Sequence, residues 1–246
     1  MAGLSPAMTM HGEPMVRGTL YGIGVGPGDP ELVTLKAVRL LRAVAVVAYP
    51  APDRGESFAR AIVAEWIGPH QREIAIRFPM RPGAPPVAIY EAAADRLAGE
   101  LEAGRDVALL CQGDAMLYGS FIPIFARLAP HHRVEIVPGV SSLAACGAAA
   151  GQPLATRDET LTVVPATLPE ADLRRRLAAA DAAAVIKIGR HLGKLRRVLD
   201  RLDLAGAAVY VERASLPVQR VAPLAAVDPE AAPYFSMVLV RRGGPF

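Results

Sequence analysis

The sequence predicts an α/β protein divided into two domains, and three observations lead to this prediction. Apolar residues make up 52% of the 246 positions but aromatic residues only 5%, so the chain can bury a large core of Ala, Val and Leu. Short apolar runs typical of strands alternate with segments of helical periodicity, which favours layered α/β structure with largely parallel sheets. The length suits one large domain or two of roughly 100–200 residues.

The first elements alternate regularly. A strand over 19–25 runs into a glycine-rich turn, and a helix is predicted over 30–43 because Asp29 is a good N-cap and Pro30 suits the first helical position. A proline-rich loop follows at 79–86. Further elements are expected up to residue 150, namely strands over 44–48, 107–111 and 134–137 and helices over 57–66, 89–103, 120–128 and 141–150.

The remaining elements continue the alternation. Strands are predicted over 160–164, 183–188, 207–211 and 234–240, and helices over 170–180 and 191–202. Residues 216–233 show no helical pattern, so strand pairing of hairpin type is expected near the end. The predicted organisation is a disordered lead-in over 1–16, a first α/β domain over 17–130 and a second over 134–246.

Charge and composition exclude several classes of function. The net charge of +3 arises entirely after residue 133, where basic residues cluster in two predicted helices. No aromatic residues interleave with these cations, which argues against nucleic acid. The clusters suit a polyanionic small molecule, or are solvated helix faces. No apolar run reaches ~18 residues, so no membrane span is predicted.

Cysteine and histidine patterns provide no metal site. Cys111 and Cys146 lie in apolar runs without CxxC spacing, which is typical of buried, reduced thiols in a cytoplasmic protein. The five histidines show neither HExxH nor facing-pair spacing, so no metal is predicted.

The glycine-rich turn Gly22-Ile23-Gly24-Val25-Gly26-Pro27-Gly28-Asp29 stands where phosphate-binding loops occur, but it lacks their patterns. The dinucleotide motif needs glycines at relative positions one, three and six, and the P-loop needs a Gly-Lys-Ser/Thr. Pro27 has no amide N–H, and Asp29 brings negative charge. The turn therefore suits a ligand that approaches the backbone closely without presenting an anion, or it is only a tight turn.

Four further segments stand at predicted strand ends, and together with the turn they resemble one family. They are CQGDAMLYGS (111–120), VPGVSS (137–142), VIKIGRH (185–191) and VERA (211–214). In order and spacing, from about Gly18 to Arg241, the series resembles the tetrapyrrole methylases, which use S-adenosylmethionine. The strings GDAMLYGSF and PYFSMVLV are most similar to members that methylate carbon 20 of precorrin-2. Gln112 replaces the usual Glu, and Ala115-Met116 replaces a Pro-aromatic pair.

The resemblance implies two αβα domains with S-adenosylmethionine folded into the trough between them. It assigns Pro27 to the surroundings of the cofactor, Ser141 and Ser142 to its methionine part, and main-chain groups of Ile188 and Ala214 to its adenine. The complete set of implied cofactor residues is Pro27, Gln112, Gly113, Asp114, Leu117, Ser141, Ser142, Lys187, Ile188, Ala214, Tyr234 and Ser236.

The substrate implied by the resemblance is a tetrapyrrole polycarboxylate. Candidate contacts are Arg77, Arg81, Tyr118, Arg157 and Arg213, since guanidinium groups suit planar carboxylates. Methyl transfer by direct displacement needs a base for the proton on carbon 20. Asp114 is the candidate, although an Asp in such a turn commonly bonds local backbone instead.

Three alternatives remain open. The substrate can be the cobalt-containing analogue, methylation can fall on another ring position, or the chain can be a non-catalytic tetrapyrrole- or nucleotide-binding module. The resemblance also implies a homodimer. We further expect a cytoplasmic protein with neither nucleic acid nor a membrane as its partner.

Overall fold

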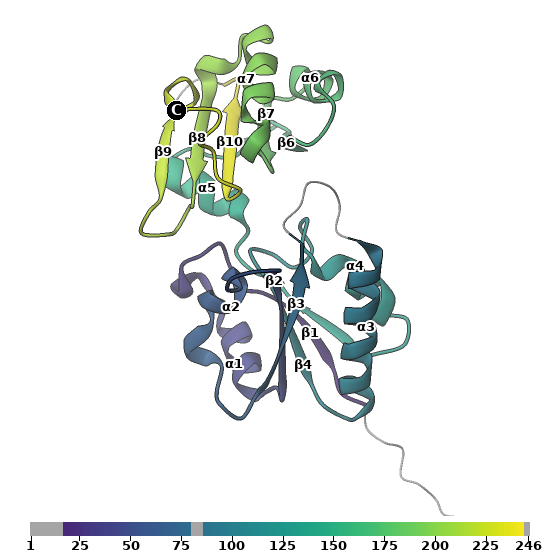
Figure 1. Cartoon of the computed structure of the whole chain (residues 1–246). Helices are drawn as coiled ribbons and strands as arrows, with labels where there is room; N and C mark the ends of the chain where they lie inside the picture. Colours follow the sequence, from purple (N-terminus) through teal and green to yellow (C-terminus); the bar gives the residue numbers. More distant parts are fainter. Residues whose placement is uncertain (1–16, 80–85, 244–246) are drawn as a thin grey trace, which may run out of the picture.

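A computed structural model describes residues 17–79 and 86–243 of the chain. It contains two five-stranded sheets, each covered by helices on both faces, which form two domains joined through the segment that follows Val137 (Figure 1). The predicted α/β class is confirmed. The expected lead-in at 1–16 and most of the proline-rich loop lie outside the described residues.

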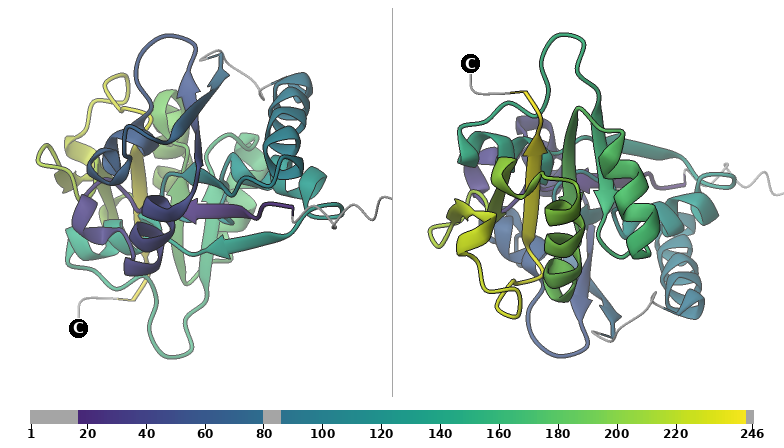
Figure 2. Two further views of the ribbon diagram at one scale, coloured as in Figure 1. Left: turned by 90° about the horizontal axis from the view of Figure 1, so that it is seen from below. Right: turned by 90° about the horizontal axis from the view of Figure 1, so that it is seen from above.

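The first sheet is entirely parallel, with the strand order β3-β2-β4-β1-β5. Its strands are β1 (Leu20–Gly24), β2 (Val46–Pro52), β3 (Arg72–Phe78), β4 (Val107–Cys111) and β5 (Val134–Val137). Helices α1 (Leu35–Ala43) and α2 (Phe58–Ile62) cover one face, and α3 (Val87–Glu102) and α4 (Phe121–Leu128) cover the other, as the views in Figure 2 show. Short 3₁₀ helices flank these elements: η1 (Pro30–Leu32) precedes α1 and η2 (Ala64–Trp66) follows α2.

The second sheet is mixed, with the order β6-β7-β10-β8-β9. Its strands are β6 (Leu161–Pro165), β7 (Ala182–Ile186), β8 (Ala208–Glu212), β9 (Arg220–Pro223) and β10 (Ser236–Arg241). Helices α6 (Glu170–Ala178) and α7 (Leu192–Arg201) cover one face and α5 (Ser142–Ala150) the other. The 3₁₀ turns here are η3 (Gly189–His191), η4 (Ala205–Ala207) and η5 (Leu224–Ala226).

The expectation of largely parallel sheets is therefore wrong for the second domain. Strand β10 inserts between β7 and β8 and runs antiparallel to both, and β8 and β9 form the hairpin expected from the lack of helix. Only β6 and β7 are parallel. Strand direction depends on which partner the last strand finds, which local periodicity does not specify.

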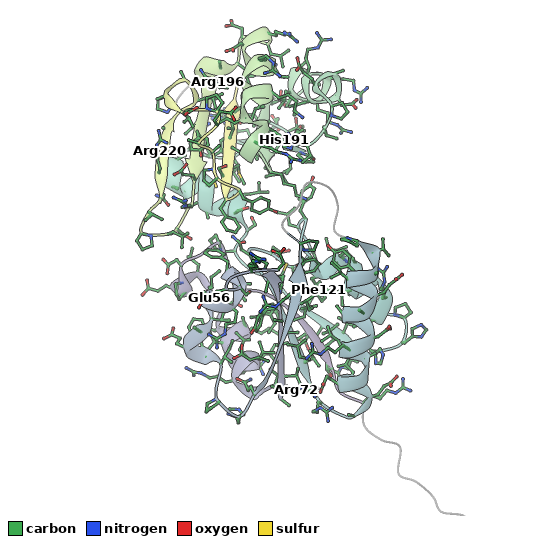
Figure 3. All side chains as sticks on the ribbon, in the orientation of Figure 1. Glu56, Arg72, Phe121, His191, Arg196 and Arg220 are labelled. Atoms are coloured by element: carbon green, nitrogen blue, oxygen red, sulfur yellow. The ribbon has the colours of Figure 1, made fainter. Side chains whose placement is uncertain are left out.

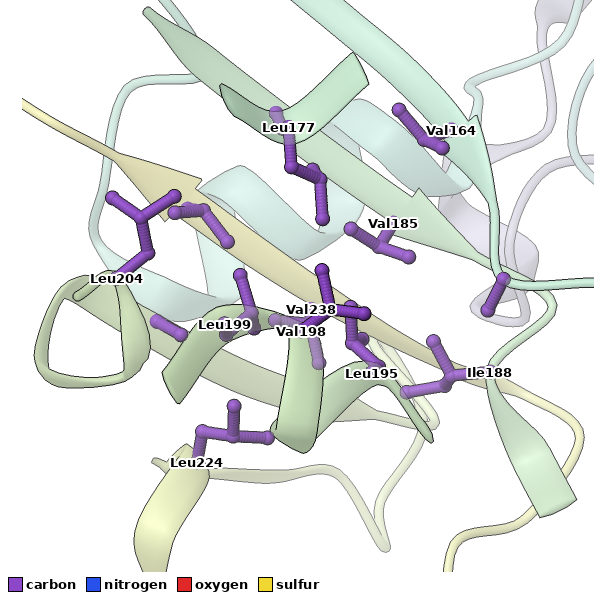
Figure 4. Packing of buried hydrophobic residues seen from close by; sticks show 14 of the residues in the cluster. Val164, Leu177, Val185, Ile188, Leu195, Val198, Leu199, Leu204, Leu224 and Val238 are labelled. Atoms are coloured by element: carbon purple, nitrogen blue, oxygen red, sulfur yellow. The ribbon is translucent and has the colours of Figure 1, made fainter. Parts of the chain in front are cut away.

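Alternation along the strands divides the core of the second domain into two layers. Val238 and Val240 of β10 pack beneath α6 and α7, whereas Met237 and Leu239 of the same strand face α5. Figure 4 shows the first of these layers, where Leu195 of α7 packs over the sheet. The apolar face predicted for residues 191–202 is the one that is buried, so this helix is held by tertiary packing.

Several boundaries differ from the sequence-based prediction for local reasons. The helix expected over 30–43 is divided, because Val33 is extended and Thr34 caps α1 by accepting the Ala37 N–H at 3.2 Å. Strand β2 continues through Pro50 and Pro52, since beyond Ala48 it pairs only with β3 and one side of its backbone needs no ladder bond. Edge strand β3 itself was not predicted.

The division between the sheets also falls later than expected. Residues 134–137, expected at the start of the second domain, pair with β1 and complete the first sheet. The change of sheet therefore follows Val137 rather than residues 130–133. A strand is visible in the sequence, but the sheet that it joins depends on a long-range pairing.

The topology of the first sheet indicates where a ligand can bind. The helices that follow the adjacent strands β1 and β4 pass to opposite faces of the first sheet. A crevice outside the carboxyl ends of parallel strands at such a point is the usual ligand position in open α/β sheets.

Within the described ranges, no helix is both long and apolar enough to cross a membrane.

Candidate functional site

A cavity lies where the two domains meet, at the carboxyl ends of β1 and β4. The loops after these strands and helix α2 form its floor, and the second domain forms its roof. The lining residues are Pro27, Phe58, Gln112, Gly113, Leu117 and Tyr118 below, and Ser142, Leu143, Cys146, Val163, Ile186, Lys187, Arg213, Ala214, Leu216, Tyr234, Phe235, Ser236 and Met237 above.

Most of the residues expected from the sequence meet at this cavity. From the expected cofactor set the structure places there Pro27, Gln112, Gly113, Leu117, Ser142, Lys187, Ala214, Tyr234 and Ser236. From the expected substrate set it places there Tyr118 and Arg213. Segments separated by about a hundred residues or more thus converge on one site.

Other expected residues are engaged elsewhere. Ile188 is fully buried in the core of the second domain, and the Ser141 hydroxyl caps α5 by accepting the Ala144 N–H at 3.5 Å. Arg77, at the end of β3, donates to the Pro52 carbonyl at 2.9 Å. Arg157 is exposed on a loop with φ of +48°. Arg81 lies outside the described residues.

Asp114 stands beside the cavity rather than in its lining. One carboxylate oxygen accepts the Met116 N–H at 2.9 Å and the other accepts the Gly139 N–H at 3.0 Å. The first bond closes a local turn of the kind expected for Asp, and the second joins the loop after β4 to the loop after β5. The geometry shows a carboxylate that holds two loops in place.

Glycine lets the loops after β1, β4 and β5 pack backbone against backbone. A Cβ on Gly139 would stand 2.2 Å from the Gly113 carbonyl oxygen, and a Cβ on Gly24 would stand 2.6 Å from the Gly139 nitrogen. Gly113 itself has φ of +69° and exchanges two backbone hydrogen bonds with Gly26. These contacts form the floor of the cavity from main chain, as expected for a ligand that approaches the backbone closely.

The glycine-rich turn also contacts the second domain. The Asp29 N–H donates to the Ser215 hydroxyl at 3.1 Å, and a Cβ on Gly28 would stand 2.7 Å from a methyl group of Leu216. The Asp29 carboxylate accepts the Glu31 N–H, so it occupies the start of η1. With Pro27 lacking an N–H, this turn offers no cradle for phosphate.

Backbone strain gathers around the cavity. Tyr118, Lys187, Arg213 and Ser215 all have φ between +50° and +70°, a region that non-glycine residues seldom adopt. Three of these four line the cavity and Ser215 adjoins it. Such strain persists where surrounding structure imposes it, and it is characteristic of binding sites.

Lys187 and Tyr118 join the two domains across the cavity. The Lys187 ammonium nitrogen lies 5.3 Å from the centroid of the Tyr118 ring, within the range of a cation–π interaction. The ring is 47% exposed, so the contact stands at the open side of the site.

Behind the roof of the cavity lies a buried polar pair. Tyr210 is fully buried and donates its hydroxyl proton to Glu212 at 2.5 Å. Burial raises the pKa of Tyr210, and the Glu212 carboxylate raises it further. Glu212 pairs with Ser236 across β8 and β10, so the polar pair supports a residue of the lining.

The two cysteines are free and buried, as expected. Cys146 lines the cavity, where burial raises the pKa of its thiol to about 12. Burial also raises the pKa of Cys111. Both thiols stay protonated at neutral pH, and thiolates are the nucleophilic and metal-binding form. Nowhere in the described ranges do three or more acidic, His or Cys side chains form a metal cluster.

The basic residues of α7 form ion pairs and hydrogen bonds away from the cavity. Glu170 of α6 pairs with Arg201 of α7 at 2.5 Å and with Arg197 at 3.5 Å. Lys194 donates to the Leu168 carbonyl and Arg196 to the Val227 carbonyl. Figure 3 shows Arg196 in the part of the second domain remote from the first. The α7 cations therefore serve as packing and surface groups.

Sequence reasoning missed part of the lining. The residues not anticipated are Phe58, Leu143, Cys146, Val163, Ile186, Leu216, Phe235 and Met237. Several are direct sequence neighbours of expected residues, so position along the motifs was an available signal. Phe58 had none, because it begins a separate helix that only the tertiary fold brings to the site.

Comparison with known proteins agrees with this geometry. The family model described as "Tetrapyrrole (Corrin/Porphyrin) Methylases" matches residues 19–228 of this chain. The Mycobacterium tuberculosis "Cobalamin biosynthesis protein CobIJ" is 45% identical over 92% of this chain, which spans only 46% of that protein. The Sinorhizobium "Precorrin-2 C(20)-methyltransferase" is 41% identical over 91% of this chain and 95% of its own length.

Solved structures share the architecture. A uroporphyrin-III C-methyl transferase from Thermus thermophilus, complexed with S-adenyl homocysteine, has a TM-score of 0.68 and 27% identity, covering 92% of this chain and 98% of its own. A cobalt precorrin-4 methyltransferase has a TM-score of 0.72 at 24% identity, over 91% and 94%, and so supports the fold alone. With the family model matching most of its length, the chain belongs to the tetrapyrrole (corrin/porphyrin) methylases.

Proposed function

We propose that this chain transfers a methyl group from S-adenosylmethionine to carbon 20 of precorrin-2, in cobalamin biosynthesis. The observation that carries the proposal is the convergence of the family's strand-end motifs on one interdomain cavity. The Sinorhizobium relative named for this reaction, similar along nearly its whole length, supports the choice of substrate and ring position.

The cavity fits the proposed cofactor by its donor set. S-adenosylmethionine carries an amino acid zwitterion, a ribose and an uncharged base, and no phosphate, which agrees with a turn that offers no phosphate cradle. Its adenine ring and the carbon atoms around its sulfonium suit a lining that is mainly apolar, including Leu117, Ala214 and Met237. The hydroxyls of Ser142 and Ser236 and the Gln112 amide provide polar contacts.

When bound, S-adenosylmethionine supplies a sulfonium methyl group that is already activated for displacement. The chain then has to orient and shield the reactants. In the proposal, main chain at Gly113 and side chains at Gln112 and Ser142 hold the cofactor, and the apolar lining excludes water. Arg213 and Lys187 offer cations for substrate carboxylates. Loss of the proton from carbon 20 completes the reaction, with Asp114 as the residue to be tested as its acceptor.

A second substrate is favoured by a specific observation. The Salmonella typhimurium "Cobalt-precorrin-2 C(20)-methyltransferase" is 34% identical over 92% of this chain and 98% of its own length. The same cavity is therefore also proposed to accept the cobalt-containing analogue. The cobalt ion in that case belongs to the substrate.

Two binding and product measurements test the function. Isothermal titration should show S-adenosylmethionine and its demethylated product binding once per chain, and absence of both would refute the methyltransferase. Incubation with metal-free and cobalt-loaded precorrin-2, followed by mass spectrometry, identifies the preferred substrate. NMR of the product made with a labelled methyl group should place the label on carbon 20.

The assembly and compartment are further parts of the proposal. We expect a homodimer, and exposed apolar side chains such as Val87 (59% exposed) and Val218 (60% exposed) offer surface for one. Two buried, unpaired thiols agree with a reducing, cytoplasmic setting. Light scattering at several protein concentrations should give twice the chain mass.

A further inference from the structure

Three aromatic side chains from both domains form a continuous group at the cavity, which we name the aromatic step. It consists of Phe58 at the start of α2 and of Tyr234 and Phe235, which precede β10. The Phe58 and Phe235 ring centroids lie 4.9 Å apart at 31°, and the Phe235 and Tyr234 centroids lie 5.2 Å apart at 75°. All three residues line the cavity.

Two members of the aromatic step are unusually accessible. The Tyr234 side chain is 64% exposed and Phe235 is 36% exposed, although both are large and mainly apolar. A single exposed aromatic residue has no special meaning, but three rings in mutual contact along a cavity present continuous apolar surface. Surface of this kind binds flat, conjugated molecules by offset stacking.

The position of the step separates it from the residues proposed for the cofactor. Pro27 follows β1 and Gln112 follows β4, the central strands of the first sheet. Phe58 instead follows β2, next to the edge strand β3.

Cations share the cavity with this aromatic surface. Arg213 and Lys187 both line it. An aromatic face bordered by Lys and Arg complements a flat apolar ring with carboxylates at its rim, since guanidinium groups bind carboxylates through paired hydrogen bonds. Adenine is flat as well but carries no carboxylate rim.

We propose that the aromatic step binds the face of the tetrapyrrole macrocycle, with Tyr234 as the contacting residue that determines affinity for this substrate. This inference rests on the proposed function and deepens it. It assigns Tyr234 to the substrate rather than to the cofactor, whose contacts then come from the loops after β1, β4, β5, β7 and β8.

The test compares Tyr234→Ala with Tyr234→Phe, which keeps the ring. Fluorescence titration with uroporphyrin III, an air-stable tetrapyrrole polycarboxylate, measures substrate-type binding. Calorimetry measures S-adenosylmethionine binding, and initial rates give KM and kcat. For Tyr234→Ala we expect tetrapyrrole Kd and KM to rise about tenfold, since ring contact area and stacking are both lost. The cofactor Kd should stay within about twofold, and Tyr234→Phe should resemble the wild type.

Controls make the outcomes distinguishable. Leu35→Ala removes an exposed apolar side chain on α1 and should change neither affinity. Because Tyr234 is exposed, its variants should keep the wild-type melting temperature. Unchanged tetrapyrrole affinity in Tyr234→Ala, or a loss confined to S-adenosylmethionine, overturns the inference while leaving the methyltransferase intact. Failure of the wild-type chain to bind the cofactor refutes the proposed function instead.

Discussion

The carboxylate of Asp114 accepts the backbone N–H of Gly139 at 3.0 Å and so joins the loop after β4 to the loop after β5. Its second oxygen accepts the Met116 N–H at 2.9 Å. The side chain is half-buried. It directly follows Gln112 and Gly113, which line the cavity, and its partner Gly139 precedes Ser142, which also lines the cavity. A charged acceptor with two main-chain donors is a strong local constraint, so this residue decides how well the floor of the site is formed.

Replacement of Asp114 distinguishes loop positioning from proton transfer. Asp114→Asn keeps one carbonyl oxygen as an acceptor and cannot take up a proton. Because both oxygens already accept main-chain N–H groups, we expect it to lower the free energy of unfolding by about 1–3 kcal/mol and kcat by less than about tenfold. Urea unfolding and steady-state kinetics measure the two effects. A fall in kcat of more than about a hundredfold, at unchanged cofactor Kd and stability, would instead support a catalytic base.

Gly139→Ala should damage the floor of the cavity directly. Its Cβ would stand 2.2 Å from the Gly113 carbonyl oxygen, and neither backbone can move without disturbing the loop after β1. We expect a loss of stability of at least about 2 kcal/mol and cofactor binding weakened beyond detection by calorimetry. The matched control is Gly99→Ala in α3, where no atom lies within 4 Å of the added methyl. That variant should gain about 0.5–1 kcal/mol, as expected for Ala in a helix interior.

The buried Cys146 thiol predicts a pH dependence of stability. Its folded pKa of about 12 lies above the ordinary value of 9.0, so the folded state favours the protonated form. The resulting stabilisation is complete below pH 9 and is lost as the pH rises toward 12, by up to about 1.4 kcal/mol per pH unit. Denaturant unfolding from pH 8 to 11 should therefore show a shallower decline in Cys146→Ala than in the wild type. Parallel curves would contradict a buried neutral thiol.

Lys187 and Tyr118 should be energetically coupled across the domain boundary. A cation–π contact at 5.3 Å with a half-exposed ring is worth about 0.5–1 kcal/mol. A double-mutant cycle with Lys187→Met and Tyr118→Leu, read out by urea unfolding, should give a coupling energy of that size. Lys187→Arg keeps the cation and should retain most of it. Additive effects of the two substitutions would show that the contact contributes nothing to domain association.

Much of the site was visible in the sequence because strand-end loops carry recognisable residues. The glycine-rich turn predicted a ligand without phosphate, and Pro27 and Asp29 provide the structural reason. The cavity contains most of the expected residues because the carboxyl ends of parallel strands share one edge of a sheet. The contact expected at Ile188 involves its main chain and stays a prediction, because its side chain is buried in the core and only its backbone adjoins the lining residue Lys187. The cation clusters of α7 were visible, but their pairing with Glu170 was not.

By itself, the sequence determined most of the alternation of strands and helices, the apolar face of α7, the cap at Asp29 and the lack of a phosphate-loop pattern. These depend on residues a few positions apart, where propensity and periodicity act. Only the tertiary structure decided that β5 completes the first sheet, that β10 inserts antiparallel between β7 and β8, and that Phe58 meets Phe235. Such relationships join residues far apart in the chain, and their free energy comes from packing that exists only after the chain has folded.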